Sequence, residues 1–153
     1  MNGSPGRLIV GAQAADYPGW REWQSSPAMR FNGAVMGRML VRPEGDIGAV
    51  LRMFPGEIHA NVVGTVHGGV ILALVDIALF ATMAVHQLGD ASAAVTLDVS
   101  NQFIGPAAIG LPLDAATEIL RQTRRIVFMR GLVVQEGATV ASFSASVRKF
   151  EPR

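Results

Sequence analysis

The longest apolar stretch of the chain runs from Val70 to Val85 and carries a single acidic residue, Asp76. The stretch is about sixteen residues long, which exceeds an ordinary strand, and it is rich in helix-forming Leu, Ala and Met. The neighbours of Asp76 at helical spacing are apolar too. The pattern therefore predicts a helix that is apolar all round and should be covered on every side.

Alternating hydrophobic and polar positions predict β-strands before and after this helix. Two alternating runs between Gly33 and Phe54 are separated by Pro43-Glu44-Gly45-Asp46, which predicts a hairpin. After a break at residues 88–92, three β-rich segments follow, of which the second is long enough for two strands: residues 93–104, 111–137 and 138–150. This order predicts an α+β fold in which a curved antiparallel sheet wraps around one long central helix.

The first 33 residues differ in composition, being rich in Gly, Pro, Ser and Asn. The segment "PGWREWQSS" predicts a short helix with Trp20 and Trp23 on one face. We interpret residues 1–33 as a leader lying across a single domain of residues 34–153.

Composition narrows the possible functions. Half of the 153 residues are hydrophobic, 16% are charged and the net charge is +1, so we expect no nucleic-acid or membrane partner. The hydrophobic surplus predicts that part of the surface is covered by another copy of the chain. The absence of cysteine excludes disulfides, thiolate zinc sites and cysteine nucleophiles. The N-terminus has no apolar signal region, and the apolar run is short and acidic for a bilayer span, so we expect a cytoplasmic protein.

Asp76 is the first candidate for chemistry. Burying an ionised carboxylate costs several kcal/mol unless it is paired or hydrogen-bonded. Asp76 is therefore either a structural residue tied to donors or a cation, or a base or nucleophile.

The tripeptide His67-Gly68-Gly69 introduces the apolar run and is the second candidate. Glycines let a ligand approach the backbone closely, and the first N–H groups of a helix have no intrahelical partner. An N–H of Gly68 or Gly69 is thus well placed to receive a developing oxyanion. Gly68 and Asp76 are eight residues apart, about 12 Å along one helix, so a single carbonyl cannot contact both. If both serve one substrate, they come from two chains across a two-fold interface.

The segments "NVVGTVHGGVILALVDIALF" and "AAVTLDVSNQFIGPA" resemble the hotdog-fold acyl-CoA thioesterases of the PaaI type. The resemblance covers about residues 45–150. It rests on Asn61, the HGG motif at His67, the acidic Asp76 nine residues after that histidine, and Thr96 two positions before Asp98.

This resemblance implies hydrolysis of acyl-CoA to a free acid and coenzyme A. Gly68 N–H would polarise the thioester carbonyl, with Gly69 beside it, and Asp76 of the facing subunit would attack the carbonyl or activate water. Thr96 would orient that water or the carboxylate, and Asn61 would position substrate or water. His67 would shape the loop or form a hydrogen bond near the thioester. The family implies a homodimer that assembles into a homotetramer, with no metal and no cofactor besides the coenzyme A of the substrate.

Other polar residues and other functions stay open. Arg121, Arg124 and Arg125 either contact coenzyme A phosphates or are solvated strand ends. Asp98 should face the same side as Thr96, as a structural residue. Two alternatives to hydrolysis are a hydratase or dehydratase of acyl thioesters on the same fold and a non-catalytic acyl-CoA-binding protein.

Overall fold

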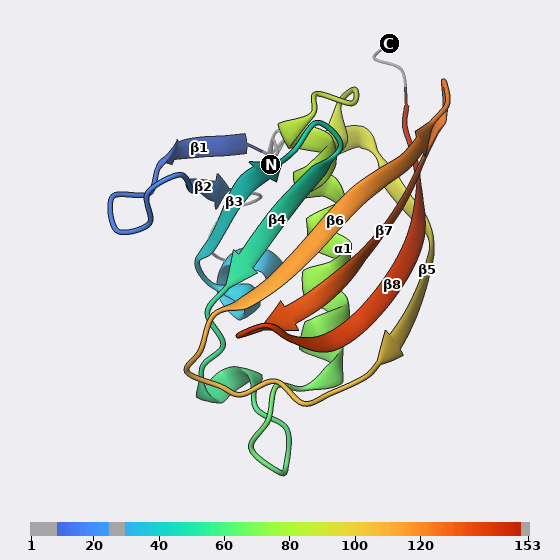
Figure 1. The fold of residues 1–153 in the computed structure, drawn as a ribbon. Helices are drawn as coiled ribbons and strands as arrows, with labels where there is room; N and C mark the ends of the chain where they lie inside the picture. The colour runs from blue at the N-terminus through green and yellow to red at the C-terminus, as the bar shows by residue number, and fades with distance from the viewer. Residues whose placement is uncertain (1–8, 25–29, 151–153) are drawn as a thin grey trace, which may run out of the picture.

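The computed structural model describes residues 9–24 and 30–150 and consists of one long helix against a curved sheet (Figure 1). The helix is α1 (Gly68–Val85). The strands are β1 (Ile9–Gln13), β2 (Arg21–Gln24), β3 (Met39–Glu44), β4 (Gly48–Met53), β5 (Val95–Phe103), β6 (Leu113–Gln122), β7 (Ile126–Gln135) and β8 (Ala138–Arg148). Short helical turns lie at Asn32–Met36, Glu57–His59 and Ala91–Ala93. The predicted hotdog architecture is confirmed.

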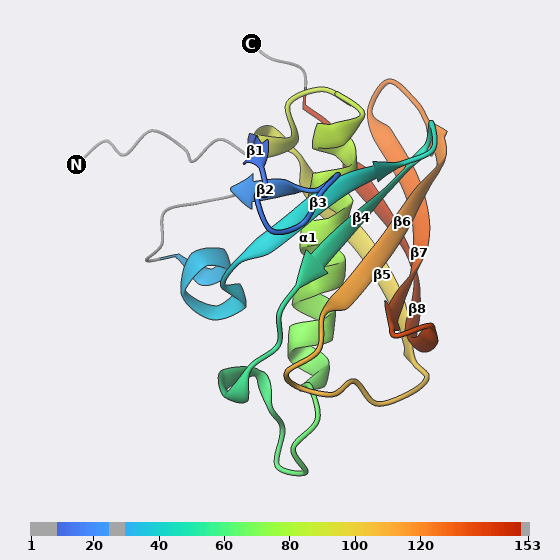
Figure 2. The same cartoon turned by 60° about the vertical axis from the view of Figure 1, so that its left-hand side comes forward.

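The eight strands form one antiparallel sheet in the order β1-β2-β3-β4-β6-β7-β8-β5. The predicted hairpin is β3–β4, and the three C-terminal β-rich segments are β5, the pair β6 and β7, and β8. β5 is the first strand after α1 in the chain, and it forms the edge of the sheet opposite β1. Its one neighbouring strand in the described chain is β8 (Figures 1 and 2).

The core lies between α1 and the inner face of the sheet. Leu74, Val75 and Leu79 of the helix are fully buried against strand residues such as Leu51 and Val127. Residues opposite each other on neighbouring strands share a face, so the strand pairing tells which side chains point at the helix. α1 is also long and apolar enough to cross a membrane, and half of it is buried inside the molecule, as in the core helix of a folded domain.

Within one chain the helix is not covered on every side. One stripe of α1 stays open, formed by Gly69, Leu72 and Asp76 at helical spacing, with Leu72 41% exposed. The sheet covers the other faces of the helix. The open stripe lies next to β5, whose residues Thr96 and Phe103 lie beside Asp76 and Gly68.

The N-terminal segment forms strands, so the helix predicted at "PGWREWQSS" is wrong. Residues Arg21–Gln24 are β2, which pairs with β3, and β1 pairs in turn with β2. Trp23 joins the main core, whereas Trp20 packs with Leu40 and Val50 in a second cluster on the outer face of the sheet. The described part of this segment therefore extends the sheet, and each tryptophan secures a different face.

Candidate functional site

Asp76 lies halfway along α1, half-buried, on the open stripe of the helix. Its Oδ1 accepts a hydrogen bond of 2.6 Å from the hydroxyl of Thr96 on β5. Thr96 is the one side chain of the described residues that donates to this carboxylate within the chain. The arrangement leaves a carboxylate with an unused oxygen, Oδ2, in an apolar setting at the edge of the molecule.

A β-bulge places Thr96 against the helix. The ladder between β5 and β8 pairs Thr96 with Val147 but Asp98 with Ser146, so the register shifts at Leu97. Thr96 consequently shares the inner face with buried Val147, while Asp98 points to the outer face. The expectation that Thr96 and Asp98 face the same side is wrong, because the extra residue inverts the alternation between them.

The HGG tripeptide forms the N-terminus of α1, and its histidine and two glycines have different hydrogen-bonding roles. His67 is the N-cap: its Nδ1 accepts a hydrogen bond of 2.8 Å from Gly69 N–H. Gly69 N–H is therefore occupied. No hydrogen bond among the described residues uses Gly68 N–H, which remains as the unpaired donor at the positive end of the helix dipole.

Both glycines have little room for a side chain. A Cβ at Gly69 would lie 3.0 Å from His67 Nδ1, so the capping imidazole would have to move by a few tenths of an ångström. A Cβ at Gly68 would lie 3.3 Å from Cε1 of Phe103, whose ring lies beside this residue. The motif thus combines a side-chain cap with one exposed backbone donor.

Asn61 organises the loop that leads to this motif. Its Oδ1 accepts hydrogen bonds from the N–H groups of Val63 and Thr65, and its Nδ2 donates to Thr65 Oγ1 at 2.9 Å. Farther on, His67 N–H donates to the carbonyl of His59, whose imidazole is buried and bonded to Gly56 and Val35. Within one chain, Asn61 therefore holds the approach to the helix in shape.

One chain does not bring Asp76 and Gly68 together. Both lie on α1, eight residues apart, which is about 12 Å along the axis. Thr96 and Phe103 lie at opposite ends of β5 and contact Asp76 and Gly68 respectively. Asp76 with Thr96 and Gly68 with Phe103 therefore lie at two separate places along the contact between α1 and β5, the α1–β5 seam.

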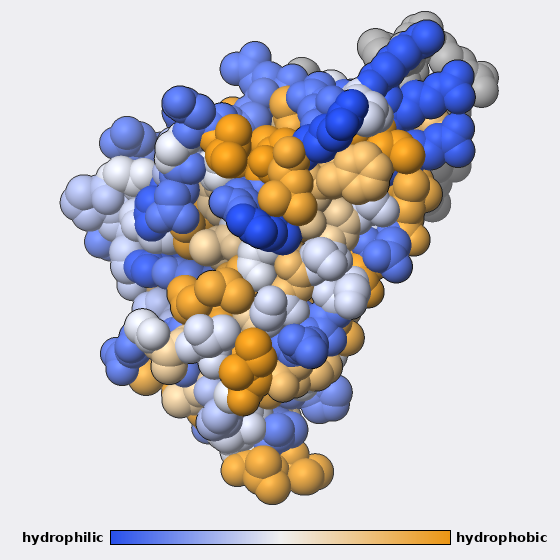
Figure 3. All heavy atoms as spheres, turned by 45° about the vertical axis from the view of Figure 1, so that its right-hand side comes forward, coloured by the Kyte–Doolittle hydropathy of each residue, from blue (hydrophilic) through white to orange (hydrophobic). Residues whose placement is uncertain are grey.

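The three predicted arginines lie at the far end of the sheet from the HGG motif. Arg121 lies near the end of β6, and Arg124 and Arg125 form the turn into β7. The register runs from Ile126 through Arg148 to Val95, so this turn is level with the start of β5 and hence with the Thr96 end of the seam. All three are exposed. Strongly hydrophilic side chains gather at the upper end of the molecule in Figure 3.

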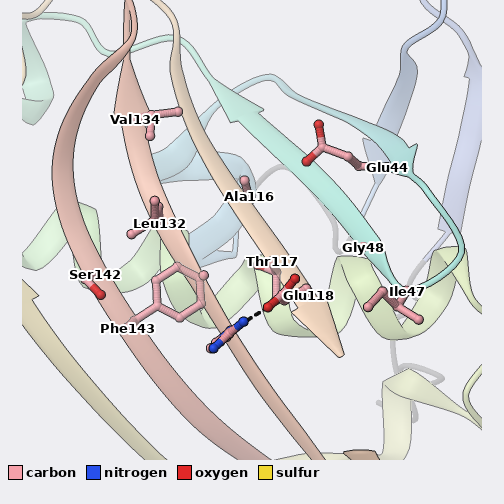
Figure 4. Close-up of a pocket in the computed structure, with 12 residues that line it drawn as sticks. Glu44, Ile47, Gly48, Ala116, Thr117, Glu118, Leu132, Val134, Ser142 and Phe143 are labelled. Carbon is pink, nitrogen blue, oxygen red and sulfur yellow. Dashed lines mark hydrogen bonds and ion pairs between the residues drawn. The ribbon is translucent and has the colours of Figure 1, made fainter. Parts of the chain in front are cut away.

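A separate hollow of about 570 Å³ lies near the β3–β4 turn over β6, β7 and β8 (Figure 4). Ile47, Leu132 and Val134 contribute apolar side chains, and Arg130 forms an ion pair with Glu118 there. Neither Asp76 nor Gly68 lines it. Within the described residues there is also no cluster of His, Asp or Glu suited to hold a metal ion.

Comparison with known proteins places these features in a family. The sequence profile of the thioesterase superfamily matches residues 63–142, which contain the HGG motif, Asp76 and Thr96. The chain belongs to the thioesterase superfamily. Human acyl-coenzyme A thioesterase 13 is 27% identical over 94 residues, which span 61% of this chain and 66% of that protein.

Solved structures of this superfamily agree with the fold. A mutant of the phenylacetic acid degradation protein PaaI from Thermus thermophilus superposes with a TM-score of 0.65 and 28% identity, covering 78% of this chain and 97% of that one. A hypothetical thioesterase from Streptococcus pneumoniae, crystallised with coenzyme A, gives a TM-score of 0.69 at 18% identity, covering 78% and 91%. The chain therefore has the hotdog fold and resembles the PaaI protein in both sequence and structure.

Sequence reasoning missed one residue beside the candidate site. Phe103 stands 35 positions after Gly68 in the chain, yet its ring lies beside that glycine. No local pattern joins the two, and the contact follows only from β5 running antiparallel to the helix along its open side.

Proposed function

We propose that the protein hydrolyses acyl-CoA thioesters to a free acid and coenzyme A. The observation that carries the proposal is the hydrogen bond from Thr96 to Asp76 on the open stripe of α1, with an unpaired Gly68 N–H at the start of the same helix. The relationship to human acyl-coenzyme A thioesterase 13 and the coenzyme A in the pneumococcal structure support this substrate class.

In the proposed reaction, Gly68 N–H donates to the thioester oxygen as negative charge develops on it. A preformed donor at a helix N-terminus stabilises such an oxyanion more than the ground-state carbonyl. Asp76 of the facing chain either attacks the carbonyl carbon or takes a proton from the water that attacks it. The C–S bond then breaks, the thiol of coenzyme A leaves with a proton, and water supplies the oxygen of the acid.

Thr96, His67 and Asn61 support these two groups. Thr96 fixes one carboxylate oxygen of Asp76 and so leaves Oδ2 for the substrate or water. His67 caps the helix and occupies Gly69 N–H, which makes Gly68 the oxyanion donor of the pair. Asn61 holds the approaching loop, and the substrate brings its own coenzyme A, so the reaction as proposed needs no further cofactor.

We propose that the site is completed in a homodimer. β5 presents a free edge next to the open stripe of α1, and both are apolar, with exposed Val95, Leu97 and Leu72. A two-fold pairing of this surface lays one helix against the other in opposite directions, so that each Gly68 meets the partner's half-site around Asp76. The second apolar surface, on the outer face around Leu120, Phe128 and Leu132, then joins two dimers into a homotetramer.

The arginine turn fits the polar end of the substrate. Arg121, Arg124 and Arg125 lie at the Thr96 end of the seam, and guanidinium groups bind phosphates through paired N–H donors. We propose that they contact the phosphates of coenzyme A from outside the reacting centre.

The proposal is tested by Asp76→Asn, assayed by thiol release from a panel of short, medium, long and aromatic acyl-CoAs. The amide keeps the shape of the carboxylate but neither attacks nor accepts a proton, so we expect kcat to fall at least about a hundredfold. The oligomer mass and melting temperature serve as controls for folding. Undiminished turnover in a correctly assembled Asp76→Asn protein would contradict the role of Asp76.

The two-chain site has a separate test, in which Asp76→Asn chains are mixed with Gly68→Val chains. We expect each parent to be inactive, since Asp76→Asn lacks the carboxylate and the valine side chain of Gly68→Val blocks the approach of the substrate to the N–H at that position. A mixed dimer holds one site with both native groups. Random pairing makes half of the dimers mixed with one native site of two, so about a quarter of the wild-type activity should return. A mixture that stays inactive although mass spectrometry detects mixed dimers would contradict the shared site.

A further inference from the structure

The ring of Phe103 lies beside the proposed oxyanion donor. A Cβ built on Gly68 would lie 3.3 Å from Cε1 and 3.4 Å from Cζ of that ring, so the ring edge closes the space that a side chain at this position would occupy. Phe103 is nevertheless 56% exposed. One edge of the ring therefore faces the first residue of the helix, and the rest of the ring is open.

The position of this ring is fixed by strand pairing. Phe103 is the last residue of β5 and lies opposite Ala141 of β8, which is fully buried, so its side chain points to the helix side of the sheet. Immediately after it, the N–H groups of Ile104 and Gly105 both donate to the carbonyl of Val140. The ladder and these two bonds hold the end of the strand against β8, so the ring is presented by a rigid element.

Within one chain the ring is not part of the buried core. It lies beside a residue that has no side chain and leaves most of its surface free on the side of β5 where we propose that the second chain packs. The ring covers the backbone next to a polar donor. Shielding such a donor from water strengthens its interaction with a developing charge, because the local dielectric falls.

We propose that Phe103 is a specificity-determining residue whose ring forms the wall beside the acyl carbonyl and restricts branching at the carbon next to it. This inference rests on the proposed function, because it takes Gly68 N–H as the oxyanion donor. A carbonyl bound to that N–H places its neighbouring acyl carbon beside the ring. Unbranched acyl groups pass along the ring, whereas a methyl branch at that carbon meets it.

The test compares two isomeric substrates, butyryl-CoA and isobutyryl-CoA, in which the same methyl group stands either at the end of the acyl chain or as a branch on the carbon next to the carbonyl. Four proteins are assayed for kcat and KM: wild type, Phe103→Ala, Phe103→Leu and the control Ile104→Ala, whose side chain is equally exposed (56%) at the next position. One methyl group in a fitted pocket changes discrimination by about tenfold or more. We expect the isobutyryl to butyryl ratio of kcat/KM to rise about tenfold in Phe103→Ala, to rise less in Phe103→Leu, and to stay within about twofold in Ile104→Ala.

The dissociation constants of both substrates are measured as well, in the Asp76→Asn background, where they are not consumed. Suppose that wild type turns over butyryl-CoA, but that Phe103→Ala leaves the isobutyryl to butyryl ratio unchanged both in kcat/KM and in the dissociation constant. The proposed role of Phe103 is then disproved, and the hydrolase proposal stands. If wild type turns over neither substrate but Phe103→Ala relaxes the discrimination in binding, the wall stands and hydrolysis fails. An equal change in Ile104→Ala would also overturn the role of Phe103, since it would show a general effect of the strand end.

Discussion

Thr96 and Asp76 show how one hydrogen bond can orient a reactive group. The hydroxyl donates to one carboxylate oxygen at 2.6 Å and so fixes the rotation of the carboxylate on an otherwise apolar helix stripe. A fixed carboxylate needs less reorganisation when the substrate arrives.

Removing this hydroxyl gives the prediction at the residue scale. Thr96→Val keeps the shape of the side chain but loses a hydrogen bond to a charged group, which is worth about 1.5–3 kcal/mol. If the bond is needed for orientation in the transition state, kcat should fall about ten- to a hundredfold, and Thr96→Ser should restore most of it. Steady-state kinetics at equal oligomer mass measures this. A Thr96→Val enzyme with wild-type kcat, or a Thr96→Ser enzyme as slow as Thr96→Val, would contradict the role.

The sequence predicted Asp76 and Thr96 as candidates but not how Thr96 faces. In "VTLDV", the apolar residues at 95, 97 and 99 alternate with Thr96 and Asp98, and that pattern alone sends both polar residues to one side. The bulge at Leu97 turns Thr96 inward and Asp98 outward. A bulge depends on the neighbouring strand and on the partner in the helix, so it leaves no signal in a single segment. The sequence did not predict that His67 would accept the hydrogen bond from Gly69 N–H either, because this bond depends on the rotamer of the histidine side chain.

At the scale of elements, the long and regular segments were predictable and the short ones were not. The apolar run became α1 with two additional residues at its start, and β5 to β8 follow the β-rich segments closely. The segment around Trp20 and Trp23 was misread because the same four residues satisfy a helical i, i+3 spacing and a strand. The free edge of β3 decided the outcome by pairing with β2, which is a tertiary effect.

The β1–β2 loop is anchored to the rest of the sheet by charge. Arg38 donates two hydrogen bonds of 2.7 Å to Asp16 and also bonds Glu22, and the guanidinium of Arg52 lies 4.4 Å from the ring centre of Trp20. The hydrogen bonds from Arg38 lower the pKa of Asp16 from 3.8 to about 2. The side chain of Asp16 is 56% exposed, so the effect is local and should weaken in salt.

This anchoring predicts a pH response. Because the pKa of Asp16 is lower in the folded state, its contribution favours folding fully above about pH 4 and is lost as the pH falls through about 2. In a Trp23→Phe protein, whose fluorescence reports Trp20, we expect the emission maximum to move to longer wavelength between pH 4 and pH 2. Adding Asp16→Asn should remove most of that shift. An identical shift with and without Asp16 would show that other carboxylates cause it.

At the scale of the whole molecule, two surfaces among the described residues are apolar and exposed, and only one of them contains a residue of the proposed site. The stripe around Leu72 lies beside the free edge of β5 and contains the carboxylate of the proposed site, whereas Leu120 and Phe128 lie on the outer face of the sheet, away from it. If the first surface forms the dimer and completes the site, its loss should abolish activity. If the second surface only joins dimers, its loss should leave the chemistry intact.

Placing one charge on each surface separates these roles. Leu72→Asp puts a carboxylate into the helix contact of the dimer, where burying it unpaired is unfavourable, so we expect folded monomers that do not hydrolyse acyl-CoA. Leu120→Asp changes a side chain that is similarly exposed, 52% against 41%, and should give active dimers in place of tetramers. Light scattering gives the mass, circular dichroism the fold, and thiol release the activity. An active Leu72→Asp monomer would show that one chain suffices for catalysis, while loss of activity in Leu120→Asp dimers would show that the outer face contributes to the site. Either result would require the two halves of the α1–β5 seam to be reassigned, because in the present arrangement only the antiparallel pairing of two helices brings a Gly68 to an Asp76.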